Sequence, residues 1–449
     1  MLKRKMQKRI ADFLTKRNDK ILLVDGARQV GKSFIIRTVG RELFPNFMEI
    51  NMYDDKKGSK VFEGTGSVDD FYFRLSTVAG TKLKKKNNTL VFLDEIQAYP
   101  ELLTLLKFLK DDDKYTYIVS GSQLGIALNE TMSKPGGRIE VVRMYPLDFE
   151  EFLWANGVGE EAILSLENAF GKRESLDETM HRVFLDLFKK YLLVGGLPDA
   201  VNKFVETNNI VEVRKVHDGI QRLYREDAAQ YDSENKLKIR RVYDLIPSNM
   251  ENKKKRVQFN EIEEKRGKSF ASYADEFEYL IQSGIAIEVK SISNPRFPLI
   301  ESTMKNLIKL YLNDVGLLTN VLYRYNIRAV LDDERSINLG SVYESVVASE
   351  LAAHGYDLYY YDNKSKGEVD FLIDDYDSLS AVPVEVKSGK NYTTHKAVDK
   401  FVANPDYHVK RAVVLSNDRA FRQDGKMEYI PVYFVMFFRP SNPVNVQIN

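Results

Sequence analysis

The sequence predicts an α/β protein of several domains, with a parallel sheet near the N-terminus, a helical middle and a second α/β domain at the C-terminus. Three observations lead to this fold class. Short apolar runs alternate with helical patterns over residues 1–147, which favours βαβ units and a parallel sheet. Residues 148–235 carry helical patterns almost throughout. Strand patterns return in the last third of the chain.

Length and composition set the class of protein. A chain of 449 residues corresponds to about three domains, each long enough to bury a core. It has no cysteine, which excludes a disulfide scaffold, thiolate zinc sites and a cysteine nucleophile. The net charge is +1, so binding to nucleic acid or membrane would require local patches. No apolar run approaches the roughly 18 residues of a membrane helix. We expect a soluble, cytoplasmic protein without a membrane partner.

A phosphate-binding motif follows the first buried strand. Residues 26–33 read G-A-R-Q-V-G-K-S and fit G-x-x-x-x-G-K-[ST] between a predicted strand, 21–25, and a predicted helix, 34–43. The backbone N–H groups of such a loop wrap phosphates, and the helix N-terminus adds a positive dipole end. We expect Lys32 to bridge the β- and γ-phosphates and Ser33 to ligate Mg²⁺. The loop as a whole comprises Gly26, Ala27, Arg28, Gln29, Val30, Gly31, Lys32 and Ser33.

Two acids end a later strand of the same predicted sheet. Residues 90–93 are apolar and are followed by Asp94 and Glu95. A buried strand avoids two carboxylates at its end unless they have partners. In a phosphate site, Asp94 would hold Mg²⁺ through its water shell, and Glu95 would orient and deprotonate the attacking water. Binding without hydrolysis is the alternative, and the adjacent Glu95 favours hydrolysis.

Three further residues are candidates for the same site. The strand 115–119 leads to Ser122 and Gln123, which would sense the γ-phosphate by hydrogen bonding, although an ordinary exit from a strand has the same appearance. Arg138 is a candidate arginine finger acting on a neighbouring site. Its alternative is a solvated surface arginine.

A second group of acids lies near the C-terminus. Asp370 belongs to one predicted strand, 369–373, and Glu385 and Lys387 share one face of the next, 382–386, because strand side chains alternate. Two acids and a lysine on adjacent strands would hold a hard divalent cation and an activated water. Lys387 would polarise that water or stabilise developing charge. The alternative is a solvent-facing strand edge with ordinary charges.

A helix predicted over 339–354 supplies a third acid to this group. Glu344 shares a stripe with small and apolar residues, an unusual neighbourhood for a carboxylate, and would complete the metal cluster. Glu350 is a rival for the role. Further strand patterns cover 309–312, 358–361, 411–415 and 432–438. The α-β-β-β-α-β order of this region is that of a nuclease core.

The segment 236–300 joins the helical middle to this region. Its helices end in a strand predicted over 285–292, a pattern suited to a winged helix. It contains the basic run Lys253, Lys254, Lys255 and Arg256, which would contact a nucleic-acid backbone. A solvated loop is the alternative.

These residues match a known family. The matching segments are 26–33, 90–97, 120–122, 145–152, 195–198, 311–318, 340–351, 369–370 and 385–387. In them the chain resembles the prokaryotic AAA-type P-loop ATPases that carry a C-terminal domain of unknown function with a PD-(D/E)XK nuclease-like core. The resemblance implies an ATPase core at 1–147, a helical lid at 148–235, a winged-helix-like segment at 236–300 and a restriction-endonuclease-like domain at 301–449.

The resemblance also directs the expected function. We expect ATP and Mg²⁺ at the N-terminal site, and Mg²⁺ or Mn²⁺ at Glu344, Asp370 and Glu385. The nucleotide cycle would control a nuclease-like domain that acts on or binds DNA. One alternative is a non-cleaving ATP-driven switch or scaffold for nucleic acid or protein. Another is a defence-linked or toxin-like nuclease regulated by ATP. Assembly into a homo-oligomer is left open.

Overall fold

The structure is a computed structural model in which two compact units are distinguished. The first comprises Met1–Pro146 and Glu278–Ile285, and the second Leu147–Phe277 and Ala286–Asn449. Each is described separately. The described residues are 2–16, 19–84, 88–124, 137–231, 236–252, 255, 257, 259–263, 269–332, 334, 337, 339–363, 367–389 and 395–441.

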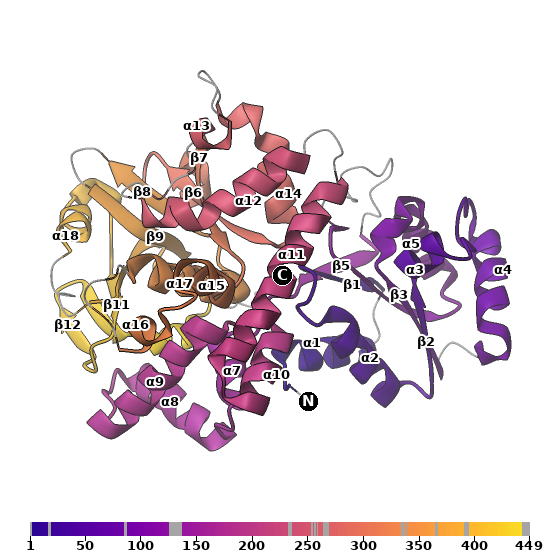
Figure 1. Ribbon diagram of the computed structural model, residues 1–449, viewed down its shortest axis with the longest axis horizontal. Helices are drawn as coiled ribbons and strands as arrows, with labels where there is room; N and C mark the ends of the chain where they lie inside the picture. Colours follow the sequence, from indigo (N-terminus) through magenta and orange to yellow (C-terminus); the bar gives the residue numbers. More distant parts are fainter. Residues whose placement is uncertain are drawn as a thin grey trace, which may run out of the picture. The chain divides into compact units, whose positions relative to one another are not determined.

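The first unit is built on a five-stranded parallel sheet (Figure 1). Its order is β2-β3-β4-β1-β5, so β1 lies between β4 and β5. Every residue of β1 and β3 is buried, which explains their continuous apolar runs. The parallel sheet expected from the sequence is confirmed. The strands are β1 (Ile21–Asp25), β2 (Asn46–Asn51), β3 (Thr89–Asp94), β4 (Thr116–Gly121) and β5 (Ile139–Arg143).

Helices connect β1 to β2, β2 to β3 and β3 to β4, as parallel pairing requires. The apolar side of α5 joins a core built on β1, β3 and β4, and Phe71 and Leu75 of α4 complete it. Asn51 caps α3, because its side chain accepts hydrogen bonds from the N–H groups of Tyr53 and Asp54. The helices are α1 (Lys5–Thr15), α2 (Lys32–Leu43), α3 (Met52–Lys57), α4 (Val68–Ala79) and α5 (Pro100–Asp112), with 3₁₀ turns η1 (Gly80–Lys82) and η3 (Ile96–Ala98).

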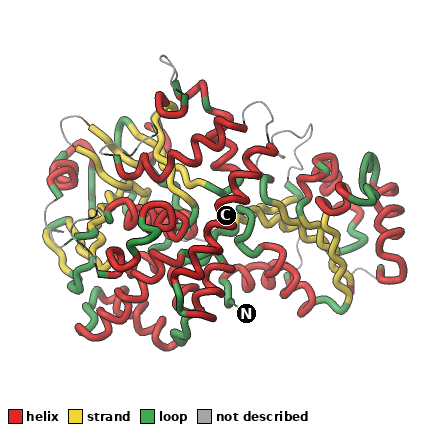
Figure 2. The backbone as a smooth tube through the Cα atoms, viewed as in Figure 1, coloured by secondary structure: helices red, strands yellow, loops and turns green. Residues whose placement is uncertain are grey.

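The second unit contains an eight-stranded mixed sheet (Figure 2). Its order is β12-β13-β11-β10-β9-β8-β6-β7. Strands β9 and β10 are antiparallel neighbours, and β10 and β11 are parallel. The mixed C-terminal sheet agrees with the expected fold class. The strands are β6 (Ala286–Ile292), β7 (Thr303–Leu312), β8 (Tyr359–Asn363), β9 (Gly367–Asp375), β10 (Ser380–Lys387), β11 (Ala412–Ser416), β12 (Arg422–Asp424) and β13 (Met427–Pro431).

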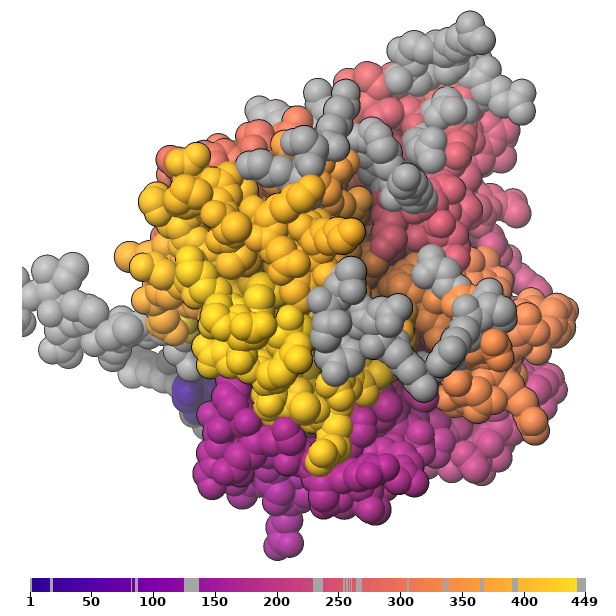
Figure 3. All heavy atoms as spheres, turned by 90° about the vertical axis from the view of Figure 1, so that its left-hand side faces the viewer, coloured from indigo at the N-terminus to yellow at the C-terminus, as the bar shows by residue number. Residues whose placement is uncertain are grey.

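Helices make up the rest of this unit. In the space-filling view of Figure 3, the N-terminal helices of the unit lie beside its C-terminal segment, and Phe170 of α8 packs against Phe434 with ring centroids 5.9 Å apart. The helices are α7 (Phe149–Ala155), α8 (Glu160–Lys172), α9 (Glu178–Val194), α10 (Pro198–Thr207), α11 (Ile210–Tyr231), α12 (Lys236–Glu251), α13 (Phe259–Ile262), α15 (Val315–Leu322), α16 (Ile327–Leu331), α17 (Gly340–Ala353) and α18 (Lys396–Val402). Helix α14 (Ala274–Gln282) begins in this unit, and its residues from Glu278 on belong to the first unit.

Two sequence-based expectations can be compared with the strands and helices of this unit. Strand β6, assigned above to a winged-helix-like segment ending at residue 300, pairs with β7 and β8 in the C-terminal sheet, and residues 147–277 belong to the same compact unit as that sheet. The predicted strand 432–438 is wrong. It is a 3₁₀ helix, η7 (Val432–Phe437), in which five successive residues from Val432 to Met436 are buried, so the apolar run reflects burial rather than strand pairing.

Candidate nucleotide site and acid–lysine cluster

The loop 26–33 has the backbone shape that the motif requires. Gly26 has φ +147° and Gly31 has φ +95°, values that a residue with a Cβ rarely adopts. A Cβ on Gly26 would also collide with the carbonyl oxygen of Met144, which follows the neighbouring strand β5. The two glycines are therefore needed for the loop to pass between β1 and α2.

Lys32 is buried inside this loop. Its Nζ donates to the carbonyl oxygens of Gly26 at 2.8 Å and Ala27 at 2.9 Å. Burial lowers the pKa of Lys32, while the negative charges of Glu95 and other acids oppose that shift. The ammonium thus lies in the concavity of the loop and is held by neutral carbonyls, which phosphate oxygens can replace.

Ser33 and Asp94 meet, as the sequence predicts for Mg²⁺ ligands. The Ser33 hydroxyl donates to Oδ2 of Asp94 at 2.8 Å, and the Ser120 hydroxyl donates to Oδ1. Burial raises the pKa of Asp94. A hydroxyl and a carboxylate in direct contact form the hard-oxygen donor set that suits Mg²⁺.

Glu95 lies beside this pair and is held by two side chains. Its Oε2 accepts from the Ser122 hydroxyl at 3.0 Å and from the Gln97 amide, and that amide also lies 3.2 Å from the Ser122 oxygen. Glu95 has φ +53°, a left-handed conformation that turns the chain at the end of β3. Ser122 therefore contacts the candidate base, and Gln97 is a residue that reasoning on function from the sequence missed.

Residues from a distant part of the chain complete the first unit. Gln123 donates from Nε2 to the hydroxyl of Tyr279 at 3.1 Å. Arg143 lies 2.9 Å from Asp25, directly before the loop, and donates to the carbonyl of Gln282 at 3.0 Å. Gly284 approaches Ala27 so closely that a Cβ would lie 3.0 Å from its backbone nitrogen. The segment 278–285 thus lies against the phosphate-binding loop, which no local motif indicated.

Arg138 and the phosphate-binding loop of the same chain lie at opposite ends of the parallel strands. It precedes β5, whereas the loop follows the carboxyl end of the parallel strand β1. Its guanidinium is 2.8 Å from Asp111 and 3.7 Å from Asp19, and its side chain is 41% exposed. Any action of Arg138 on a phosphate would therefore be directed at a neighbouring molecule.

The C-terminal acids come together as their strand positions predict. Strands β9 and β10 pair with Val384 opposite Phe371, which places Asp370 next to Glu385. The backbone N–H of Val386 donates to Oδ2 of Asp370 at 2.9 Å, and the Lys387 ammonium lies 2.6 Å from Oε1 of Glu385. Burial, followed by the charge of Asp370, raises the pKa of Glu385 to about 8.

Glu344 of α17 joins this group and brings more charges with it. Burial, followed by the charge of Asp370, raises its pKa to about 7. Its Oε1 pairs with the ammonium of Lys255, and its Oε2 accepts from the Tyr311 hydroxyl at 3.4 Å. Lys309 on β7 pairs with Glu368 on β9 in the same neighbourhood. We call the set Glu344, Glu368, Asp370, Glu385, Lys255, Lys309 and Lys387 the acid–lysine cluster.

The side chains of the acid–lysine cluster can be compared with what the expected C-terminal metal ion would need. Its carboxylates are hard donors, and Oε2 of Glu385 is buried without a hydrogen-bond partner among the described residues, which suits a cation there. In that part of the chain, however, no three acidic or histidine side chains are arranged to hold a metal ion. Lysine ammoniums already engage Glu344 and Glu385, so the acids are gathered but occupied by charge partners.

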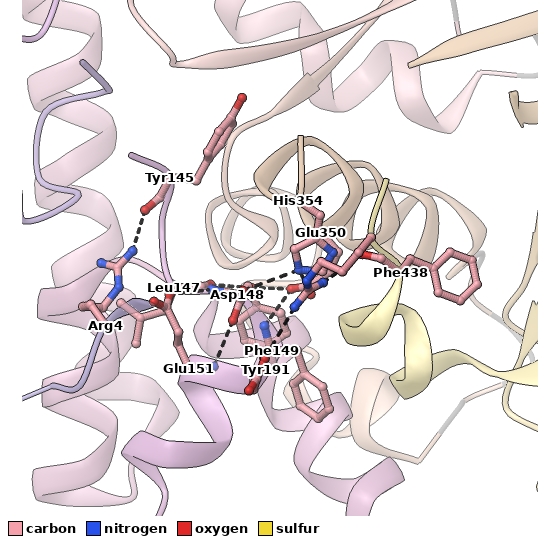
Figure 4. A network of polar contacts seen from close by, with 12 residues as sticks. Arg4, Tyr145, Leu147, Asp148, Phe149, Glu151, Tyr191, Glu350, His354 and Phe438 are labelled. Atoms are coloured by element: carbon pink, nitrogen blue, oxygen red, sulfur yellow. Dashed lines mark hydrogen bonds and ion pairs between the residues drawn. The ribbon is translucent and has the colours of Figure 1, made fainter. Parts of the chain in front are cut away.

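Glu350, the rival of Glu344, faces elsewhere. Figure 4 shows it in a separate network, where its Oε1 accepts from the backbone N–H of Phe149 at 2.7 Å and from the hydroxyl of Tyr191 at 3.3 Å. The buried ring of His354 lies 3.5 Å from Asp148 and 3.7 Å from Glu350. This network fixes the start of α7. Glu344 therefore fits the cluster, and Glu350 does not.

The basic run 253–256 is only partly described. Lys253, Lys254 and Arg256 lie outside the described residues. Lys255 is described, and its ammonium is directed at Glu344 rather than at solvent.

Family comparisons assign the first unit to a class. Residues 18–153 match the model of an AAA domain. The chain therefore contains an ATP-binding P-loop domain of the AAA class, in agreement with the motif, the loop and the parallel sheet. Residues 185–326 and 339–435 each match a domain of unknown function, DUF8612 and DUF4143 respectively. The expected nuclease-like character of the C-terminal domain therefore stays a proposal.

Solved structures give weaker likenesses. The Walker-type ATPase of Pyrococcus abyssi is 14% identical, with 74% of this chain and 96% of that chain covered, at a TM-score of 0.45. The Hsp104–ADP complex of S. cerevisiae is 12% identical, with 79% and 43% covered, at a TM-score of 0.30. No curated protein matches the chain. Among the described residues, no helix combines the length and apolar character needed to cross a membrane.

Proposed function

We propose that the first unit hydrolyses ATP with Mg²⁺. The observation that carries this proposal is the contact of Ser33 with Asp94 beside Lys32 and Glu95, since these four side chains supply each role that phosphoryl transfer needs. Bound Mg²⁺ would neutralise charge on the β- and γ-phosphates. Lys32 would exchange its carbonyl partners for phosphate oxygens.

The base in this proposal is Glu95. It accepts the proton of the attacking water, and Ser122 and Gln97 hold its carboxylate in place. Gln123 would contact the γ-phosphate after leaving Tyr279.

The test is steady-state ATP hydrolysis by the full chain with and without Mg²⁺, beside Asp94→Asn. We expect turnover to require Mg²⁺ and to fall strongly in the variant, while Asp111→Asn, at the other sheet edge, retains it. Equal turnover in Asp94→Asn would refute the assigned role.

We further propose that the nucleotide cycle controls the second unit, which acts on or binds DNA. The path of the chain supports this control of the second unit by the nucleotide. Segment 278–285 lies against the phosphate-binding loop, and the next residue, Ala286, begins β6 of the mixed sheet. Motion of the loop on binding ATP would therefore pull directly on a strand of the second unit.

Binding of a labelled DNA duplex in ADP and in a slowly hydrolysed ATP analogue tests this control. We expect affinity to differ between the nucleotides and the difference to shrink in Arg143→Ala, which loses the bonds to segment 278–285. The same affinity in both nucleotides would refute control of DNA binding.

Cleavage is supported by the placement of Asp370, Glu385 and Lys387 on adjacent strands. Plasmid nicking with Mg²⁺ or Mn²⁺ is the assay, and Asp370→Ala is expected to abolish it while leaving ATP hydrolysis intact. If wild type binds DNA but never cuts it, the non-cleaving switch or scaffold is the better reading. Toxicity on expression that Asp370→Ala removes would favour the defence-linked alternative.

A further inference from the structure

The N-terminal segment contributes a buried arginine to the phosphate-binding loop. Arg4 lies directly before α1, where its backbone N–H donates to Oε1 of Gln7 at 3.2 Å. Although it belongs to a basic segment, Arg4 is only 6% exposed. Helix α1 packs against α2, the helix that follows the loop, so the side chain of Arg4 lies beside the loop. A buried guanidinium needs hydrogen-bond acceptors for its N–H groups.

Two backbone carbonyls act as acceptors for Arg4. Its Nη1 donates to the carbonyl oxygen of Val30 at 3.1 Å, and its Nη2 donates to that of Tyr145 at 2.8 Å, a bond drawn in Figure 4. Val30 belongs to the phosphate-binding loop. Tyr145 follows Met144, whose backbone N–H donates to the carbonyl of Asp25 at 2.7 Å. Because the second bond anchors the guanidinium to the chain that leaves β5, the first bond holds the Val30 carbonyl in one direction.

The direction of this carbonyl sets the direction of a phosphate-binding group. The peptide between Val30 and Gly31 is trans, so its C=O and its N–H point to opposite sides. This N–H belongs to Gly31, and the backbone N–H groups of such a loop cradle the phosphates. A carbonyl that accepts from a cation also polarises its own peptide and strengthens the N–H as a donor.

The backbone on both sides of Val30 needs such support. Gln29 has φ +67° and Gly31 has φ +95°. A left-handed conformation of a residue with a Cβ persists only where the surrounding structure holds it. The bond from Arg4 to the carbonyl between these two residues is a contact of that kind.

We propose that Arg4 is a positioning residue of the nucleotide site, which directs the Gly31 N–H at the phosphates by holding the Val30 carbonyl on the other side of the peptide. This inference rests on the proposed binding of ATP at the loop and adds a residue outside the motif that orients one of its donors. The loop cradles phosphates that ATP and ADP share. Arg4 therefore serves nucleotide binding rather than the chemical step.

The test compares Arg4→Ala with wild type as full chains. Equilibrium binding of ATP, ADP and inorganic triphosphate is measured with Mg²⁺, beside kcat and KM for ATP. We expect all three ligands to bind about tenfold more weakly, because an oriented hydrogen bond to a charged group is lost. KM should rise by a similar factor while kcat stays within about threefold of wild type. An equal loss for triphosphate, which has neither base nor ribose, assigns the effect to the phosphates.

Two further variants separate positioning from folding. Arg9→Ala removes an exposed arginine of the same helix and should change neither affinity nor KM. Arg4→Lys keeps a cation that can donate to the Val30 carbonyl, and it should restore all three affinities to within about threefold of wild type. Melting temperatures without ligand show whether each variant is folded. If Arg4→Ala is not, Arg4→Gln, which lacks the charge but keeps part of the stem, takes its place with the same expected loss.

The outcomes separate the role of Arg4 from the nucleotide site itself. Unchanged affinities in folded Arg4→Ala overturn the inference and leave ATP binding and hydrolysis standing. A loss for ATP that triphosphate does not share also overturns it, because Arg4 would then act on the base or the ribose. If wild type binds ATP without hydrolysing it, the binding measurements decide alone. Wild type that binds none of the three ligands overturns the inference together with the proposed nucleotide site.

Discussion

The two sites of this molecule use the same residue types and satisfy them in different ways. In the first unit the Lys32 ammonium is held by backbone carbonyls, and Asp94 and Glu95 accept hydrogen bonds from hydroxyls and an amide. In the second unit the glutamates are paired with lysine ammoniums. A neutral partner is exchanged for a ligand at small cost, whereas breaking a buried ion pair leaves an uncompensated charge.

The two sites therefore differ in what a ligand would have to displace. At the P-loop, ATP and Mg²⁺ would exchange only with the neutral partners of Lys32 and Asp94. In the acid–lysine cluster, a ligand of the glutamates would have to displace a lysine that is already paired with them.

The largest expected effect comes from Lys32→Ala. Lys32 is the side-chain cation inside the loop, so its removal should weaken ATP binding and lower hydrolysis by about a hundredfold or more. Turnover and nucleotide affinity are measured together. The matched change in the other site, Lys387→Ala, should leave hydrolysis unchanged. Comparable losses of ATP hydrolysis in Lys32→Ala and Lys387→Ala would contradict the distinction drawn between the two sites.

The second-largest effect is expected from Glu95→Gln. The amide keeps the shape of the side chain but cannot accept the proton of the water, so turnover should fall by about 10² to 10⁴ with ATP still bound. Single-turnover hydrolysis and equilibrium binding give the two quantities. Unchanged turnover would place the base elsewhere and leave Glu95 as a structural partner of Ser122 and Gln97.

A smaller effect is expected from pH. The pKa values of Glu344 and Glu385 are raised to about 7 and about 8, so the folded state holds protons that the unfolded state has released above pH 4.5. The free energy of unfolding of the second unit should therefore fall as pH rises from about 4.5 to 8. One such proton corresponds to a slope of about 1.4 kcal/mol per pH unit at most.

Chemical unfolding in a chelator measures this slope, and Glu385→Gln should reduce it because the amide does not titrate. The control is Glu428→Gln, a glutamate of β13 outside the cluster. A slope that Glu385→Gln leaves unaltered would mean that the cluster does not titrate as a buried acid group, and the contrast with the P-loop would weaken.

The sequence predicted the first site better than the second for a physical reason. The P-loop is a local motif whose glycines, lysine and serine are consecutive, and its strands are buried on both faces, so their apolar runs identify them. For the second site, strand alternation correctly placed Asp370 beside Glu385. Nothing local indicated that Lys255 would reach Glu344, since the two are 89 residues apart.

Other differences have the same origin. Tyr279 and Gly284 lie near the phosphate-binding loop only because segment 278–285 returns to the first unit. The apolar run 432–438 has the sequence pattern of a buried strand, but a 3₁₀ helix buries such a run equally well. The only sequence feature that could have indicated Gln97 is its position two residues after Glu95, a candidate base.

The smallest effect is expected from Arg138→Ala in dilute solution. Arg138 lies at the sheet edge away from its own loop and pairs with Asp111 at the surface, where an ion pair contributes about 0 to 1 kcal/mol. Stability and turnover of single chains should therefore change little. If chains assemble and Arg138 acts as a finger on the next one, turnover should fall in the variant only as the protein is concentrated. Mixing Arg138→Ala with Lys32→Ala should then restore part of the activity, because each variant supplies what the other lacks. Turnover that stays at the wild-type level at every concentration would leave Arg138 as a surface ion pair.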